Sequence, residues 1–148
     1  MNPNASVSDI LSYKGSNTWT ISPDATVLEA VQMMADKNVG ALLVTDNGRL
    51  VGIISERDYT RKVVIKGKSS KTTAVKEILS SQVVHVTPET TVQECLRLMT
   101  DHHFRHLPVL EGDQIAGIVS IGDLVNWIIS AQTSTISQLQ TYITGVPA

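Results

Sequence analysis

The sequence predicts a fold of class α+β or α/β, in which two tandem β-α-β-β-α units pack sheet to sheet and a C-terminal helix follows. Two observations carry this prediction. The 148-residue chain aligns with itself without a gap, residues 21–58 on residues 86–123, and 12 of these 38 pairs are identical. Within each copy, the apolar residues change from helical to strand spacing. A unit of roughly 60 residues is marginally stable alone, so the copies are expected to pack together.

The repeat divides the chain into four segments. We expect a first unit over residues 7–65, a polar linker over 66–74, a second unit over 75–131 and a helical tail over 132–148. Residues 7–11 also resemble residues 75–79, although their offset differs slightly from that of the main repeat. The tail continues the helical spacing of apolar residues, and we expect it to cover the units or to pack on another subunit.

Each unit contains an amphipathic helix with a start signal in front of it. Thr26-x-x-Glu29 and Thr91-x-x-Glu94 are expected to form capping boxes, in which hydroxyl and carboxylate satisfy free backbone donors. Behind each box, apolar residues recur at i, i+3, i+4 and i+7, which describes one buried stripe. The stripes consist of Val27, Ala30, Val31 and Met34 in the first copy and Val92, Cys95, Leu96 and Met99 in the second.

A β-hairpin and a second helix are predicted after each of these helices. Strands are expected over residues 41–44 and 50–54 in the first copy and over 107–110 and 115–119 in the second. Asp46-Asn47-Gly48 predicts a tight turn, because Asn-Gly tolerates positive φ, and Glu111-Gly112-Asp113 takes its place in the second copy. The second helix opens at Ser55 or Ser120.

Charge and composition exclude several classes of function. Twelve Lys and Arg against fourteen Asp and Glu give a formal net charge of −2, which lacks the basic footprint of a nucleic-acid-binding protein. No stretch approaches the roughly 18 apolar residues of a membrane span, and the first six residues do not read as a secretory signal. A single cysteine cannot form an internal disulfide. We therefore expect a cytoplasmic protein with neither a nucleic-acid partner nor a membrane partner.

The strongest candidate for a binding site is a motif that occurs in both copies. Gly52-Ile53-Ile54-Ser55-Glu56-Arg57-Asp58 corresponds to Gly117-Ile118-Val119-Ser120-Ile121-Gly122-Asp123. Ser-x-x-Asp at a helix start is itself a capping box, which is a purely structural role. The same geometry can serve a ligand, since amides at a helix start favour phosphate and a nearby carboxylate can accept both hydroxyls of a ribose. Two copies, each after an apolar strand, favour ligand binding.

With these motifs, the sequence resembles the cystathionine β-synthase (CBS) domain family in its paired form, the Bateman module. The resemblance covers about residues 7–131 and rests on the duplicated segments 21–27 and 86–92, on Leu107-Pro108-Val109 and on both Gly-x-x-Ser-x-x-Asp motifs. It implies two symmetry-related clefts between the units. In the family, such clefts often hold adenosine-bearing ligands, namely AMP, ADP, ATP, NAD or S-adenosylmethionine.

The resemblance also implies roles for individual residues. Asp58 and Asp123 would hold riboses, and Ser55 and Ser120 would lie near phosphate. Backbone and apolar groups around four further residues would line the adenine slots: Thr20, Ile21, His85 and Val86.

Basic residues near the second strand are candidates for phosphate contact. In related modules a basic residue before this strand reaches the phosphates, which points to Arg105 and His106; a charged surface at a helix end is the alternative. The first copy has the uncharged pair Gly40-Ala41 there, and Arg57 is expected to compensate in that half. We thus expect one positive group in each half and two inequivalent clefts. Lys14 is a weaker candidate and is expected to be a solvated loop lysine.

A metal site and a catalytic site receive little support. His102 and His106 are four residues apart, which suits a shared metal only if the helix continues through both, with His103 and Cys95 as further ligands. The strand start at Leu107 argues that the helix ends earlier. Cys95 falls on the apolar stripe and is expected to be a buried, inert thiol. The sequence contains no nucleophile elbow, Walker loop or dinucleotide fingerprint.

The expected function is therefore regulation by ligand binding. An adenine nucleotide, bound as a regulatory ligand and not as a required cofactor, would shift the arrangement of the halves and so alter an unidentified partner protein. A homodimer is expected as well. Two alternatives stay open, a scaffold with empty clefts and an enzyme that holds NAD as a redox cofactor. The motifs do not distinguish AMP from ATP or NAD.

Overall fold

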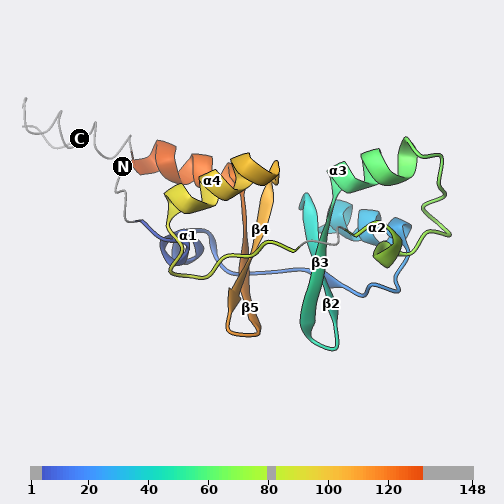
Figure 1. The fold of residues 1–148 in the computed structure, drawn as a ribbon, viewed down its shortest axis with the longest axis horizontal. Helices are drawn as coiled ribbons and strands as arrows, with labels where there is room; N and C mark the ends of the chain where they lie inside the picture. The colour runs from blue at the N-terminus through green and yellow to red at the C-terminus, as the bar shows by residue number, and fades with distance from the viewer. Residues whose placement is uncertain (1–4, 80–82, 132–148) are drawn as a thin grey trace, which may run out of the picture.

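The computed structural model describes residues 5–79 and 83–131, and its elements follow the predicted order (Figure 1). The first half contains α1 (Val7–Lys14), β1 (Thr20–Ile21), α2 (Val27–Lys37), β2 (Ala41–Asp46), β3 (Arg49–Ser55), α3 (Glu56–Tyr59) and the π-helical turn η1 (Thr60–Val64). The second half contains the 3₁₀ turn η2 (Val75–Glu77), α4 (Val92–His102), β4 (His106–Glu111), β5 (Gln114–Ser120) and a helix over residues 121–131. The tail expected over 132–148 lies outside the described residues.

Two small sheets form the centre of the molecule. In the first sheet, β2 pairs with β1 in parallel and with β3 antiparallel. In the second, β4 and β5 form the equivalent hairpin, and the place of β1 is taken by a single parallel bridge between Val86 and Val109. The two sheets contact each other through β3 and β5. Figure 1 shows them side by side, with α2 and α3 beside β2 and β3 and with α1 and α4 beside β4 and β5. This confirms the predicted pair of β-α-β-β-α units.

The segments that precede the two repeats are exchanged between the units. The amide of Val7 donates to the carbonyl of Thr90 at 2.8 Å, and the amide of Val75 donates to that of Ala25 at the same distance. As a result, α1 packs on the second unit, although it precedes the first in sequence. Ile78 lies correspondingly in the core of the first unit. Each unit is therefore completed by a segment that the chain carries ahead of the other.

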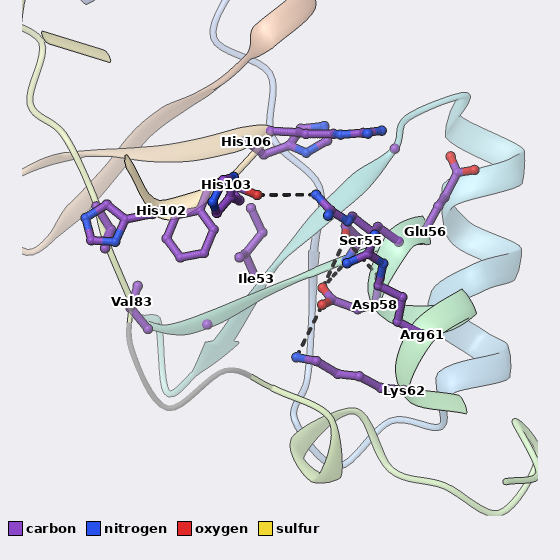
Figure 2. A pocket seen from close by; sticks show the side chains of 16 residues that line it. Ile53, Ser55, Glu56, Asp58, Arg61, Lys62, Val83, His102, His103 and His106 are labelled. Atoms are coloured by element: carbon purple, nitrogen blue, oxygen red, sulfur yellow. Dashed lines mark hydrogen bonds and ion pairs between the residues drawn. The ribbon is translucent and has the colours of Figure 1, made fainter. Parts of the chain in front are cut away.

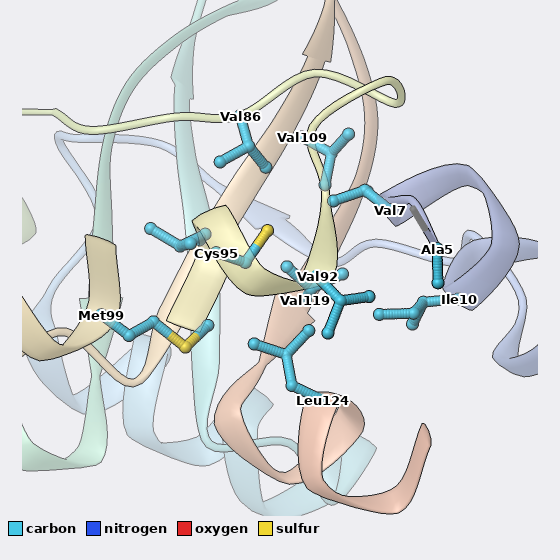
Figure 3. Close-up of a cluster of buried hydrophobic side chains, with 11 residues drawn as sticks. Ala5, Val7, Ile10, Val86, Val92, Cys95, Met99, Val109, Val119 and Leu124 are labelled. Atoms are coloured by element: carbon cyan, nitrogen blue, oxygen red, sulfur yellow. The ribbon is translucent and has the colours of Figure 1, made fainter. Parts of the chain in front are cut away.

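Each unit has its own hydrophobic core, built largely from the predicted stripes. Figure 3 shows the second core, in which Val7 and Ile10 of α1 pack with Val92, Val119 and Leu124. All five side chains are almost completely buried. The contribution of α1 to this core explains why residues 7–11 resemble residues 75–79. Each segment supplies apolar side chains to the core of the unit that it does not precede in sequence.

The predicted local signals are confirmed with one correction. Asn47 and Gly48 both have positive φ, at 52° and 79°, as the tight turn requires. Thr26 and Glu29 form the complete capping box at the start of α2. At the start of α4 only half of the expected box exists: Thr91 accepts from the amide of residue 94 at 3.1 Å. The carboxylate of that residue, Glu94, pairs instead with Arg97 one turn further along the helix.

The second helices of the two units differ. Ser55 caps α3, which changes after one turn into the π-helical η1. Residues 121–131 are α-helical throughout. None of the helices within residues 5–79 and 83–131 combines the length and apolar character needed to cross a bilayer.

Candidate functional site

Two cavities lie where the units meet, and each is built by both of them. The larger, of about 520 Å³, contains Ser55 and Asp58 of the first unit and is here called the Asp58 cleft. The smaller, of about 290 Å³, contains Ser120 and Asp123 of the second unit and is called the Asp123 cleft. Residues 103–106 of the second unit complete the Asp58 cleft, and residues 38–41 of the first complete the Asp123 cleft.

The two clefts are related by the offset of the sequence repeat. Residues 38–41 correspond to 103–106 at an offset of 65, and both segments join a helix to the first strand of a hairpin. Thr18 and Trp19 line the Asp123 cleft, and their counterparts Val83 and Val84 line the Asp58 cleft. The units thus face each other in a pseudo-two-fold arrangement, which produces two related clefts.

Both Ser-x-x-Asp motifs form capping boxes. The amide of Ser55 donates to Oδ2 of Asp58 at 2.9 Å, and the amide of Asp58 donates to the Ser55 hydroxyl at 3.2 Å. The amides of Ser120 and Asp123 make the same pair of bonds at 2.8 and 3.1 Å. The structural role of the motif is therefore present in both copies. It holds each carboxylate at the wall of its cleft, where the side chain keeps 26% exposure for Asp58 and 24% for Asp123.

A lysine pairs with each of these carboxylates. Nζ of Lys62 lies 3.3 Å from Oδ1 of Asp58 (Figure 2). It also donates to the carbonyl of Ile78. Nζ of Lys14, the last residue of α1, lies 2.7 Å from Oδ2 of Asp123. The expectation that Lys14 is a solvated loop lysine is therefore wrong, because the exchange of α1 brings it onto the second unit. Each lysine thus connects the aspartate of a motif to an exchanged segment. Lys14 belongs to such a segment itself, and Lys62 contacts one through the carbonyl of Ile78.

The two candidate arginines lie at the same cleft. Arg57 and Arg105 were expected to serve different halves, but both line the Asp58 cleft. The physical reason is the pseudo-two-fold arrangement, in which the helix start of one unit faces the strand start of the other. Nη1 of Arg57 donates to the carbonyl of His103, at the C-cap of α4, over 3.3 Å. The expectation that Arg57 and Arg105 serve different halves is therefore wrong, and the basic side chain that lines the Asp123 cleft is that of Lys14.

His106 lines both clefts. Its ring lies against the backbone of Gly40, where a β-carbon would be 3.6 Å from Nε2. Burial lowers the pKa of His106 below its ordinary value, and the carboxylate of Asp123 acts in the opposite direction. A largely neutral imidazole therefore stands between the two cavities.

The residues expected at the adenine slots do not line the clefts, and they directly follow the residues that do. The side chains of Ile21 and Val86 belong to the hydrophobic cores, with 8% and 3% exposure. Thr20 and His85 are exposed, and neither lines a cleft. The lining comes from the residues immediately before them, 18–19 and 83–84. Further along each extended segment, the side chain of residue 21 or 86 points into the core.

Several lining residues escaped the sequence analysis. Arg61 and Lys62 line the Asp58 cleft, and Glu56 does so as well. Lys62 could have been found, since it stands one helical turn after Asp58, at the i+4 spacing of an ion pair. Trp19 lines the Asp123 cleft and had no such signal in the sequence. Nζ of Lys37 lies over its ring, 4.4 Å from the centroid.

The candidate metal ligands do not gather into a site. In the described part of the chain, no three or more His, Cys, Asp and Glu side chains are placed to hold a metal ion. As predicted, α4 ends before His106: its last residue is His102, and His103 has the left-handed φ of 57°. The ring of His102 stacks instead on that of Phe104, with centroids 5.4 Å apart. Cys95 is buried, as expected, and burial raises its pKa to about 11.

Comparisons with known proteins agree with this geometry. Residues 7–65 and 75–130 each match the CBS domain family model. The CBS domain-containing protein CBSX3, mitochondrial, of Arabidopsis thaliana is 40% identical over an alignment that covers 94% of this chain and 72% of the relative. A solved structure of a protein with CBS domains from Burkholderia ambifaria is 45% identical, covers 86% of this chain and 96% of its own, and has a TM-score of 0.83. The hexameric CBS-CP12 protein from bloom-forming cyanobacteria is 34% identical, covers 74% and 65%, and has a TM-score of 0.68.

Proposed function

Because this chain belongs to the CBS domain family, as a pair of CBS domains, we propose that it binds an adenine nucleotide between its units and serves as an energy or redox sensor for a partner protein. Stand-alone CBS-domain proteins are generally regulatory and not catalytic, and they bind adenosyl ligands. The proposed ligands are AMP, ADP, ATP and NAD(H). One observation carries the proposal, namely two related clefts that each contain a Ser-x-x-Asp carboxylate.

The proposed ligand contacts follow from the geometry. Asp58 and Asp123 face their clefts from the first turn of a helix, where a carboxylate can accept the two hydroxyls of a ribose. Arg105 lines the Asp58 cleft and is suited to a phosphate, because a guanidinium offers paired donors. An apolar wall for the adenine would come from Val83 and Val84 in one cleft and from Trp19 in the other.

A bound nucleotide can act on a partner protein because each cleft is shared between the units. A ligand that contacts residues 103–106 and Asp58 together favours one arrangement of the two units over others. The population of that arrangement then rises with ligand concentration, and the surface that it presents changes with it. Lys14 adds a second route, since a ribose at Asp123 would compete with the ion pair that ties α1 to the cleft.

The same proposal includes a homodimer. Ile121, Val125 and Ile129 recur every four residues along the helix over 121–131, and they are 44%, 44% and 54% exposed. Such spacing forms a continuous apolar stripe along one face of the helix. Family members form oligomers, as the hexameric CBS-CP12 structure illustrates. A second copy of the chain is the occupant that we propose for this stripe.

The nucleotide proposal is tested by identifying the ligand directly. Small molecules released from the natively purified protein are identified by mass spectrometry, alongside a melting panel of AMP, ADP, ATP, NAD, NADH and S-adenosylmethionine. A binder raises the melting temperature with its concentration, since it stabilises only the folded state. An empty protein that no member of the panel stabilises would overturn the proposal in favour of a scaffold.

The dimer proposal is tested with two equivalent substitutions. Val125→Glu places a charge in the stripe, whereas Thr60→Glu places one at the equivalent position of the first unit, 65 residues earlier. We expect sedimentation to show a shift to monomer for Val125→Glu only. Equal masses for both variants and the unchanged chain would contradict the proposed interface.

A further inference from the structure

We infer that the Asp58 cleft is the polyanion site of this chain and that it selects an adenosyl ligand with two or more phosphates, whereas the Asp123 cleft does not. The inference rests on the proposed function and goes beyond it, because it assigns both the ligand class and the cleft. The observation behind it is the uneven distribution of charged side chains between two otherwise equivalent cavities.

The Asp58 cleft carries a surplus of positive charge. Four basic side chains line it against the two carboxylates of Glu56 and Asp58; the basic residues are Arg57, Arg61, Lys62 and Arg105. Among the residues that the structure describes, the Asp123 cleft is lined by a single Lys, Lys14, and a single carboxylate, Asp123. Because charges that line a concave surface act together on a ligand, the first cleft attracts a multiply charged anion and the second does not.

Lys62 of the Asp58 cleft pairs with Asp58, whereas the three arginines of this cleft make no ion pair within the described residues. In the described part of the chain, neither Arg61 nor Arg105 has a carboxylate partner within ion-pair distance. Arg57 donates to a neutral carbonyl and makes no ion pair with a carboxylate of residues 5–79 or 83–131. Lys14 of the other cleft lies 2.7 Å from Asp123, so that the two charges already neutralise each other.

The unequal distribution of charge is present in the sequence repeat itself. At the offset of 65, the basic residues Arg57, Arg61 and Lys62 correspond to Gly122, Asn126 and Trp127, and Arg105 corresponds to Gly40. Two of these cations, Arg61 and Lys62, lie on the π-helical turn η1, whose counterpart in the second unit is regular α-helix. All four of these repeat positions therefore place their cation at the Asp58 cleft, and the one cation at the Asp123 cleft among the described residues, Lys14, precedes the repeat.

The size and the chemistry of the two cavities agree with this assignment. A volume of about 520 Å³ falls within the range of roughly 300–1,000 Å³ that small-molecule sites occupy, whereas about 290 Å³ lies at its lower edge. Guanidinium groups bind phosphate oxygens through two parallel hydrogen bonds, so that several Arg side chains suit a chain of phosphates. The cationic sulfonium of S-adenosylmethionine would be repelled by the same surplus.

The test compares four probes on the full chain by calorimetry: adenosine, AMP, ATP and inorganic tripolyphosphate. The variant is Arg61→Ala with Arg105→Ala, and the matched control is Asn126→Ala, the counterpart of Arg61 in the other unit. We expect one ATP per chain. Two lost charge-assisted contacts should weaken ATP and tripolyphosphate at least about tenfold in the double variant, while adenosine changes by less than about twofold. The control should bind all probes unchanged.

The outcomes separate this inference from the proposed function. Equal affinities for ATP and adenosine, two equivalent ATP sites per chain, or unchanged ATP binding by the double variant would overturn the polyanion site and leave nucleotide binding intact. Arginine-dependent binding of tripolyphosphate with no binding of adenosine, AMP or ATP would support the polyanion selectivity and overturn the adenosyl ligand. Absence of binding for all four probes would overturn both.

Discussion

Leu11 packs against the bare α-carbon of Gly117, since a β-carbon on that glycine would stand 2.8 Å from Cδ2 of the leucine. The same relationship recurs between Leu79 and Gly52, where the corresponding distance is 3.1 Å. Each glycine lies in the second strand of a hairpin, and each leucine lies in an exchanged segment. The glycine of the repeated motif therefore admits an exchanged leucine closely, which accounts for its presence without a ligand.

Gly117→Ala should lower the free energy of unfolding by about 1–2 kcal/mol, because the added methyl overpacks a site that is already filled. Gly52→Ala should cost less, since its closest contact would be longer. Urea unfolding of the two variants measures the difference. In a Leu11→Ala background the penalty at residue 117 should vanish, because the conflicting side chain is gone. An undiminished penalty there would contradict the leucine contact.

The fold could largely be predicted because its determinants are local. The Asn47-Gly48 turn, the Thr26 capping box and the buried stripes are each specified within a few residues, and each lies where it was expected. The hydrogen bonds at the start of α4 are not specified locally in this way. Glu94 can satisfy either the backbone of Thr91 or the guanidinium of Arg97, both three residues away, and the sequence spacing does not rank the two.

The composition of the clefts could be predicted only in part because it depends on how the two units face each other. Ser55 and Asp58 were found from their motif, and the structure places both at one cavity. That Arg57 shares this cavity with Arg105 follows from the pseudo-two-fold arrangement, which no local pattern reveals. The exchange of α1 has the same character, because the resemblance between residues 7–11 and 75–79 does not show which unit buries either segment. Lys14 was expected in a loop, whereas it ends α1 and lies beside Asp123.

Cys95 should resist thiol reagents in the folded protein. Burial raises its pKa to about 11, so that the reactive thiolate is scarce at pH 8, and the packed core excludes the reagent. Because Cys95 is the only cysteine, the colour released by an aromatic disulfide reagent reports on it alone. We expect slow reaction without denaturant and fast, stoichiometric reaction in concentrated urea. Fast reaction of the native protein would contradict the buried site.

His106 should make stability depend on pH. The folded protein holds its pKa below the ordinary value of 6.5, so that the unfolded chain binds the proton more readily in the interval between the two values. Protonation there favours unfolding, and the free energy of unfolding should fall as the pH drops below about 6.5 until the folded-state pKa is passed. The charged groups that act on the ring are Asp123, Lys14, Arg105 and Glu56.

The variant that isolates this effect is His106→Gln, which keeps a polar side chain but does not titrate. We expect its stability to lose less than that of the unchanged chain between pH 7 and pH 5, as measured by urea unfolding. His85→Gln, at an exposed position, serves as the control and should retain the full dependence. Parallel curves for the His106 variant and the unchanged chain would show that other groups set the slope.

Asp58→Asn and Asp123→Asn form the sharpest comparison between the two clefts. Each substitution removes the charge of a capping carboxylate and the ion pair that it makes with a lysine, so that the structural cost should be similar. If the polyphosphate ligand occupies the Asp58 cleft and its ribose is held there, Asp58→Asn should weaken ATP at least about tenfold, since a carboxylate that accepts two hydroxyls is lost. Asp123→Asn should leave ATP affinity within about twofold, because its cleft lacks the surplus of cations.

Calorimetry on both variants, with melting temperatures as the check on folding, measures these effects. A larger loss of ATP affinity for Asp123→Asn would place the ligand in the other cleft.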